Sequence, residues 1–530
     1  MASRPATDTP AIGVRAWRRL RRRMQPPQYV APPGYKAEFP ATAEVFGRFL
    51  DRVPSSPPAV GRAPVGVVVA PWLATPLPWW SITLALALQR RGRPVMLLWE
   101  DTDTVPGQPG SRSQNEVIRP ILERVEPILP TVRVSDQGRG PRSRSDRALV
   151  HRLGALNETW HLRGGASDDS VEFDRRALER NLGRTLRRIR ALFEHHELDY
   201  VVATGGIWGT SGLFVQAGEE AGVRVSTYDA GQGWFLSSNR GPAAHQSEVA
   251  TVFRQLWRDD LAGLEPCLSA ARAEFEARAG GRDRAAFQLV AVKTDAPEHP
   301  VGVLVPMNVD FDSAALDRHV YFADTTEWIL ETVAFILTRS SSHIVVRQHP
   351  SERRELERSR LDLRERLRER FGDEPRLRFV AADDPVSSYD LVREADLVVP
   401  FVSTFGIEAA ALGKPVITAG ASYYDDLGFV HSGSSRTEYF DLLDRALDRR
   451  LPPLAQQQER AWLCYYLSQC CNRVWSDFTP QPDDFRRWCA RPPDEIFRDD
   501  AVQDLLASID ADVPLAQIRH QRARAMTRPG

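Results

Sequence analysis

The stretch from Ser341 to Tyr424 decides the fold class of this chain. It holds three short apolar runs, His343-Ile-Val-Val-Arg347, Ala395-Asp-Leu-Val-Val-Pro-Phe401 and Lys414-Pro-Val-Ile-Thr418, each followed by a break. The runs are rich in β-branched residues, and the segments between them have the apolar spacing of helices. This alternation predicts parallel strands joined by helices. Open α/β sheets bind ligands where their strands end, so the loops after these runs are the first candidate site.

Two of these loops carry the candidate binding residues. Arg347 and His349 end the first run, where a histidine can donate a hydrogen bond to a phosphate oxygen and an arginine adds charge. Ser403 and Thr404 lie where the second strand gives way to a helix expected over Phe405–Leu412, and hydroxyls with free N–H groups at a helix start can bind an anion. Glu408, one turn further, can reach a sugar hydroxyl.

Each of these residues also has a purely structural interpretation. His349 can simply end a strand, Ser403 can be an ordinary N-cap, and Glu408 can complement the helix dipole from the first turn. The residues alone leave both interpretations open.

The first half of the chain repeats the alternation of strands and helices. Strands are predicted at Val65–Ala70, Pro94–Trp99, Tyr200–Thr204 and Val223–Tyr228, a loop at Pro71–Trp80, and helices at Ser81–Arg90 and about Asp174–His196. The rhythm restarts at Pro300–Pro306. The expected fold is therefore α/β, with two Rossmann-like domains facing a central cleft and a boundary near 285–300.

Asp229 is the candidate catalytic group of the first half. It follows the predicted strand 223–228 in a turn that contains Gly231 and Gly233. A carboxylate at that sheet edge would face the cleft and could act as a general base, although a turn-forming aspartate is an equal alternative. Gly205 and Gly206, after the preceding strand, would let a ligand approach the backbone.

Composition excludes several classes of protein. The 530 residues carry 69 basic and 70 acidic side chains, a net charge of −1, which gives no reason to expect a nucleic-acid partner. The five cysteines lack metal-ligand spacing, which favours free thiols in a reducing cytoplasm and no zinc. No secretory signal is found, and prolines interrupt the one long apolar tract, Val65–Leu88, so no membrane span is expected.

The two ends of the chain are predicted to differ from its middle. Residues 1–60 are expected to form a flexible basic arm, and residues 451–530 helices and a tail. Within the arm, Val14–Met24 can place Val14, Trp17, Leu20 and Met24 on one face among arginines. Such a helix can lie on an anionic membrane surface, and a disordered basic arm is the alternative.

Several motifs together resemble the capsule polysaccharide biosynthesis family. They are Arg347-Gln-His-Pro350, Ala395-Asp396, Ser403-Thr-Phe-Gly-Ile-Glu408-Ala, Gly413-Lys-Pro-Val416, and Gly420 with Tyr424 and Gly428 at four-residue spacing. The resemblance covers chiefly residues 300–430. The segment Trp234-Phe-Leu-Ser-Ser238 is similar to another family motif, but Gln232 and Gly233 stand where the family has two acidic residues.

The resemblance implies a GT-B glycosyltransferase that uses a nucleotide sugar, of the bacterial type that transfers Kdo or sialic acid from a CMP derivative. His349, Ser403 and Thr404 would bind the donor phosphate and Glu408 the nucleotide or sugar, in a domain of residues 291–450. Residues 61–290 would bind the acceptor glycan or glycolipid. No metal or other cofactor is expected, and the location would be cytoplasmic, with peripheral membrane contact as an option. A polyol-phosphate transferase, a nucleotide-sugar 2-epimerase and a catalytically inactive binding subunit are the alternatives.

Overall fold

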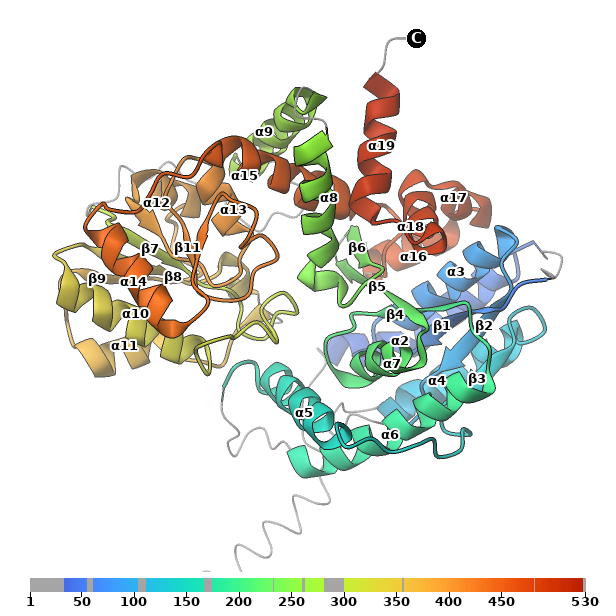
Figure 1. Ribbon diagram of the computed structural model, residues 1–530. Helices are drawn as coiled ribbons and strands as arrows, with labels where there is room; N and C mark the ends of the chain where they lie inside the picture. The colour runs from blue at the N-terminus through green and yellow to red at the C-terminus, as the bar shows by residue number, and fades with distance from the viewer. Residues whose placement is uncertain are drawn as a thin grey trace, which may run out of the picture.

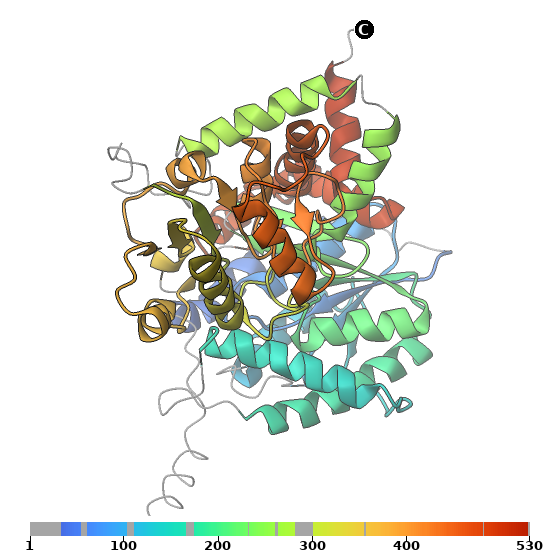
Figure 2. The ribbon, with the colours of Figure 1, turned by 60° about the vertical axis from the view of Figure 1, so that its left-hand side comes forward.

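The computed structural model describes residues 33–54, 61–102, 111–165, 174–231, 233–259, 263–280, 300–354, 357–480 and 482–527. These residues form two α/β lobes, each built on its own parallel sheet, as Figures 1 and 2 show from two directions. The predicted class, with two Rossmann-like domains, is confirmed. The basic segment Val14–Met24 and the expected boundary at 285–300 lie outside the described residues, except for residue 300.

The N-terminal sheet has the strand order β13-β6-β5-β4-β1-β2-β3. Its five parallel members, β3-β2-β1-β4-β5, follow the order of a doubly wound nucleotide-binding half. The bounds are β1 Val65–Val69, β2 Val95–Trp99, β3 Thr131–Arg133, β4 Tyr200–Thr204, β5 Arg224–Gly231, β6 Trp234–Ser238 and β13 Val474–Trp475. β6 and β13 extend the sheet in antiparallel fashion.

The C-terminal sheet repeats the same order. β9-β8-β7-β10 are hydrogen-bonded in parallel, and a parallel bridge between Val398 and Val416 adds the segment that leads into β11. The bounds are β7 Val303–Pro306, β8 Ile344–Arg347, β9 Leu377–Val380, β10 Leu397–Val398, β11 Ile417–Thr418 and β12 His431–Ser432. The strand order reverses between β7 and β10, and open sheets bind ligands at such a point.

Helices cover both faces of each sheet, as buried β-branched strands require. In the N-terminal lobe one face packs against α3 (Leu77–Arg90) and α4 (Ser111–Val125), and the other against α5 (Asp146–Leu162), α6 (Arg175–His195) and α7 (Gly209–Ala221). In the C-terminal lobe one face packs against α10 (Thr325–Arg339), α11 (Leu363–Phe371) and α14 (Arg436–Leu447). Its other face packs against α12 (Ser388–Glu394), α13 (Phe405–Ala411) and α15 (Gln457–Tyr465).

The expectation of a flexible arm over residues 1–60 is wrong for residues 33–50. Helix α2 (Pro33–Leu50) buries Phe46 completely, with its ring 5.6 Å from that of Trp79 and 6.2 Å from that of Phe485. Aromatic burial of this extent makes α2 part of the N-terminal core.

The chain crosses between the lobes twice. The lobe on which each helix packs therefore does not follow the predicted domain limits of 61–290, 291–450 and 451–530. Helices α8 (Ser247–Asp259) and α9 (Glu265–Ala279) join the core of the C-terminal lobe. Helices α16 (Pro482–Ala490), α17 (Pro493–Arg498) and α18 (Asp500–Ala511) return to the N-terminal core, beside α2 and α3 in Figure 1, and α19 (Leu515–Thr527) ends the described chain. Hydrophobic spacing finds helices but does not say which sheet they cover.

Two local predictions also need correction. Helix α3 begins at Leu77 rather than Ser81, because Pro78 is tolerated in the first turn of a helix. Asp229 does not follow its strand but lies within it, since β5 continues to Gly231 by pairing with β6. Among the described residues, no helix is long and apolar enough to cross a membrane.

Candidate functional site

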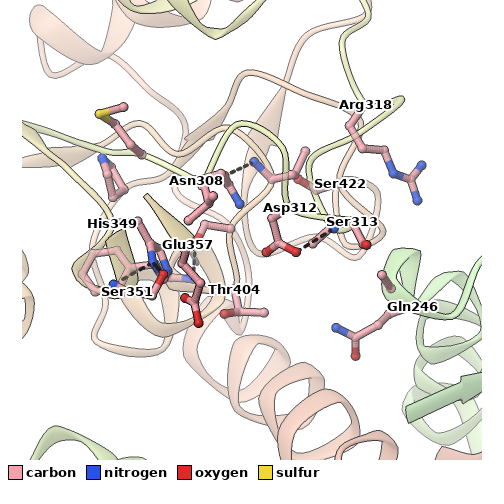
Figure 3. A pocket seen from close by; sticks show the side chains of 18 of the residues that line it. Gln246, Asn308, Asp312, Ser313, Arg318, His349, Ser351, Glu357, Thr404 and Ser422 are labelled. Carbon is pink, nitrogen blue, oxygen red and sulfur yellow. Dashed lines mark hydrogen bonds between the residues drawn. The ribbon is translucent and has the colours of Figure 1, made fainter. Parts of the chain in front are cut away.

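A cavity of about 490 Å³ lies between the two lobes. Its C-terminal wall is made by the loops that follow β7, β8, β10 and β11, which are the carboxyl ends of that sheet. Its N-terminal wall comes from β5, β6 and the segment around Gln246, and Figure 3 shows Gln246 across the cavity from Asp312 and Thr404. The structure thus brings Asp229, Arg347, His349, Ser403, Thr404 and Glu408 to one cavity, as the sequence predicted.

His349 is a neutral hydrogen-bond donor. Its Nδ1 accepts from the backbone N–H of Ser351 at 3.2 Å and lies 2.7 Å from the Ser351 hydroxyl. These bonds place the ring proton on Nε2, for which no protein partner is found among the described residues. Burial, and then the Arg347 charge, lower the pKa of His349 to about 4, so the ring can donate a hydrogen bond at neutral pH but adds no charge.

The start of α13 presents the hydroxyls of Ser403 and Thr404, while the N–H groups of its first turn are bonded within the chain. The Phe405 N–H donates to the Ser403 hydroxyl at 3.2 Å, and the next three N–H groups donate to the carbonyls of Ser403 and Thr404. The expectation of free amides therefore does not hold for Phe405 to Glu408, because the chain itself supplies acceptors for their N–H groups. The Thr404 side chain makes no capping hydrogen bond and, with Ser403, lines the cavity.

Arg347 braces a loop. Its guanidinium donates to Ser388 Oγ at 3.2 Å, to the Val386 carbonyl at 3.3 Å and to the Ala381 carbonyl, and the residue is only 3% exposed. Burial lowers the pKa of Arg347 to about 10, which still leaves it charged at neutral pH. It can therefore act on a bound anion through its field, while its hydrogen bonds hold the loop after β9.

Glu408 is occupied by protein partners. Arg278 of α9 donates to its carboxylate at 3.3 Å, Tyr389 is a second donor, and the residue is 3% exposed. Burial raises the pKa of Glu408 to about 7, against the lowering effect of Arg278 and Tyr389. The carboxylate borders the cavity, but its hydrogen bonds tie α13 to α9.

Asp229 faces the cavity from the N-terminal wall. Its Oδ1 accepts from the Ala230 N–H at 3.0 Å, and no other hydrogen bond to its carboxylate is found within the described chain. Burial, and then the negative charge of Asp312 on the opposite lobe, raise the pKa of Asp229 to about 7. A carboxyl group with a pKa near the working pH suits a general base.

A second cavity of about 170 Å³ shares Asp229, Ala230 and Ser313 with the first. Gly205 and Gly206 line this second cavity rather than the main one, with φ of +69° and +96°. Ligand approach to their backbone stays a prediction. A Cβ on Gly206 would lie 2.8 Å from the Thr227 methyl group. Gly231 and Gly233 instead shape the β5–β6 hairpin and line neither cavity. Gln232 lies outside the described residues.

Sequence reasoning missed several cavity residues: Asn308, Asp312, Arg278, Arg318 and Arg473. Asn308 and Asp312 had a signal, since they follow the strand 303–306 at the same sheet edge as His349. Asn308 Oδ1 accepts from the Val402 N–H at 3.3 Å and so joins the loops after β7 and β10. Arg278 and Arg473 had no such signal in the sequence, because they belong to segments that are distant in sequence from the strands of this sheet edge.

Residues 275–449 match a protein family described as "Capsule polysaccharide biosynthesis protein". The resemblance predicted from the motifs is thus confirmed over these residues. No curated protein matches the chain.

Solved structures with similarity to the chain include two described as Thermosulfurimonas dismutans KpsC. The beta Kdo 2,4 transferase has 13% identity, covers 56% of this chain and 88% of its own, and has a TM-score of 0.34. The beta Kdo 2,7 transferase has 16% identity, the same coverage and a TM-score of 0.32. MurG of Acinetobacter baumannii has 12% identity, and the similarity covers 81% of this chain and 99% of the MurG chain, with a TM-score of 0.27. None of these scores is high enough to support a conclusion about this chain.

Proposed function

We propose that this chain is a glycosyltransferase that transfers a sugar from a nucleotide-activated donor to a growing surface polysaccharide or glycolipid. One observation carries the proposal. Uncharged hydrogen-bond donors gather at the strand ends of one lobe, and a carboxyl group with a pKa near 7 faces them from the other lobe. The match of residues 275–449 to a capsule biosynthesis family supports the same conclusion.

In this mechanism the donor phosphate lies against the C-terminal wall. His349 Nε2–H and the hydroxyls of Ser403 and Thr404 donate to its oxygens, and Arg347 adds positive field from below the loop. The acceptor hydroxyl attacks the anomeric carbon while Asp229 takes its proton, and the bond between that carbon and the phosphate oxygen breaks. These donors can take the leaving charge, so the proposed reaction requires no metal ion.

The acceptor would enter from the N-terminal lobe through the second cavity. Gly205 and Gly206 leave room for a ligand near the backbone there, and the rings of Trp72 and Trp208 border the same space, 4.9 Å apart. Flat apolar rings beside polar groups suit a sugar ring, which has apolar faces and polar edges. The cavity ends at Asp229, where the acceptor hydroxyl must be deprotonated.

A panel of activated donors tests the proposal. Purified protein is incubated with CMP-, CDP-, UDP- and GDP-activated donors, first CMP-activated sugar acids, with an acceptor glycan. Donor hydrolysis or sugar transfer supports the proposal. Transfer of a polyol phosphate from a CDP donor, isomerisation of a UDP-sugar, or binding without turnover would instead identify the polyol-phosphate transferase, the 2-epimerase or the inactive binding subunit.

Work on a lipid-linked acceptor would place the protein at the cytoplasmic face of a membrane. The basic segment Val14–Met24 remains our candidate for peripheral contact. A chain that lacks residues 1–26 should lose affinity for anionic vesicles. Equal vesicle binding by the two chains would remove this part of the proposal.

A further inference from the structure

Arg473 differs from the other arginines that line the main cavity. Arg278 donates to Glu408, Glu274 and Gln469, and Arg347 donates to the loop after β9. Arg318 donates to the His245 carbonyl at 3.5 Å. Across the described chain, the Arg473 guanidinium has neither a carboxylate within 4.0 Å nor a hydrogen-bond acceptor, although it lines the cavity.

The position of Arg473 is fixed from two sides. It directly follows the π-helix η5 (Tyr466–Asn472) and precedes β13, which pairs with β6 in the N-terminal sheet. π-Helical turns are rare and often occur at functional sites. The guanidinium lies over the ring of Trp234 in β6, 4.5 Å from its centroid, so the charge is held in place at the point where the chain passes from one lobe to the other.

The charged groups near Arg473 act on it without direct contact. Asp312, Glu274 and Arg278 act on it through their fields, but none is hydrogen-bonded to it. Burial, and then the Arg278 charge, lower the pKa of Arg473 to about 10, so it remains protonated at neutral pH. A half-buried guanidinium presents five N–H donors in a planar fork that matches the two oxygens of a carboxylate or phosphate.

We propose that Arg473, held on Trp234, forms an oxyanion subsite on the N-terminal side of the cavity and binds a carboxylate or phosphate of the substrate. The subsite is separate from the wall of His349, Ser403 and Thr404, which is built from the other lobe. This inference rests on the proposed function in one respect, because it assumes that the substrate binds in this cavity. An arginine that served solely as a stacking link between the lobes would not need to line the cavity.

Paired probes test this subsite by calorimetry at constant ionic strength. One pair is CMP and cytidine, and the other is N-acetylneuraminate and its methyl ester, so each pair differs by one anionic group. We expect Arg473→Gln to weaken binding of the anionic member of at least one pair by about tenfold or more, with its neutral partner changed less than about twofold. The affected pair identifies the bound group as phosphate or carboxylate.

Arg460→Gln is the matched control. Arg460 also lies over a tryptophan, 4.4 Å from the centroid of Trp257, but it does not line the cavity. It should leave all four affinities unchanged. Arg473→Lys keeps the charge without the fork and should give an intermediate loss, which provides a second variant if Arg473→Gln does not fold.

Two results would overturn the subsite. One is wild-type protein that binds the charged and neutral members of both pairs equally, or binds none of the four. The other is a folded Arg473 variant with wild-type affinity for both anions. The binding measurements need no turnover, so the subsite and the proposed function can fail separately. If the protein transfers sugar but its Arg473 variants bind anions as the wild type does, the proposed function stands and the subsite is wrong. If anion binding depends on Arg473 but no sugar is transferred, the subsite stands and the proposed function is wrong.

Discussion

At the scale of single residues, Asp229 sets the expected pH dependence. A base must be deprotonated, and burial with the Asp312 charge raises the pKa of Asp229 to about 7. We therefore expect kcat/KM to fall as the pH drops below about 7. Asp312→Asn removes the negative charge that favours protonation, so the acidic limb of the profile should move to lower pH. A limb that stays in place, or moves upward, would contradict the coupling between the two carboxyl groups.

His349 should act as a neutral donor throughout this range. Its pKa of about 4 means that the ring gains a proton only well below pH 6, so His349 itself should add no titration between pH 5.5 and 8. His349→Ala should lower kcat/KM by about 10²-fold, the usual scale for losing an electrostatic contact to the leaving group, with little change in thermal stability. Wild-type rates in this variant would remove His349 from the site.

At the scale of elements, the buried aromatic contacts of α2 should contribute to the stability of the N-terminal core. Phe46 is fully buried among Trp79, Phe49 and Phe485. Phe46→Ala should therefore lower the free energy of unfolding by roughly 3–5 kcal/mol in urea titrations. Glu44→Ala, on the exposed side of the same helix, is the control and should change it by less than about 0.5 kcal/mol. Equal effects of the two substitutions would show that α2 does not pack as described.

One buried ion pair, between Arg278 and Glu408, links α9 and α13. Arg278→Ala leaves the Glu408 carboxylate buried without its cation and should cost roughly 3–5 kcal/mol of unfolding free energy at pH 8. Burial already raises the pKa of Glu408 to about 7, and losing Arg278 raises it further. A raised pKa means that stability falls as the pH increases and the carboxyl ionises. The cost should therefore be smaller at pH 5.

The control for this ion pair lies in the same helix. Arg272 pairs with Glu265 at 3.1 Å on the surface, so Arg272→Ala should cost less than about 1 kcal/mol at either pH. An Arg278→Ala cost that is the same at pH 5 and pH 8 would show that Glu408 is not the group left unpaired.

At the scale of the whole molecule, the sequence predicted what depends on local pattern. β8 and the loop with His349, the strand β7 and the helix after Thr404 all lie close to their predicted positions. Short β-branched runs and the breaks after them are sufficient to locate parallel strands and their carboxyl ends. Six predicted residues therefore reached the same cavity.

Long-range packing could not be predicted in the same way. Arg473 reaches the cavity because the chain returns to the N-terminal sheet through β13. Arg278 reaches it because α9, like α8 before it, packs on the C-terminal lobe although the strands that precede both helices belong to the N-terminal sheet. Neither of these chain paths produces a periodic pattern in the sequence. The backbone bonds that close the first turn of α13 also depend on geometry that residue types do not specify.

The proposed mechanism divides the reaction between the lobes. In this proposal the C-terminal lobe would bind the donor through His349, Ser403 and Thr404, and the N-terminal lobe would supply Asp229 as the base; all four residues line the main cavity. A change at Asp229 should therefore separate donor binding from chemistry, since the proposed role of its carboxylate is only to take the acceptor proton.

The most direct test compares sugar transfer and donor affinity in the same preparations of wild-type protein and Asp229→Asn. The donor is the one that wild-type protein uses in the panel. We predict that transfer falls by roughly 10²- to 10⁴-fold while donor affinity stays within about twofold. Transfer at the wild-type rate, or a matching loss of donor affinity, would contradict the assignment of Asp229 as base, and wild-type protein that transfers sugar from no donor would contradict the proposed function itself.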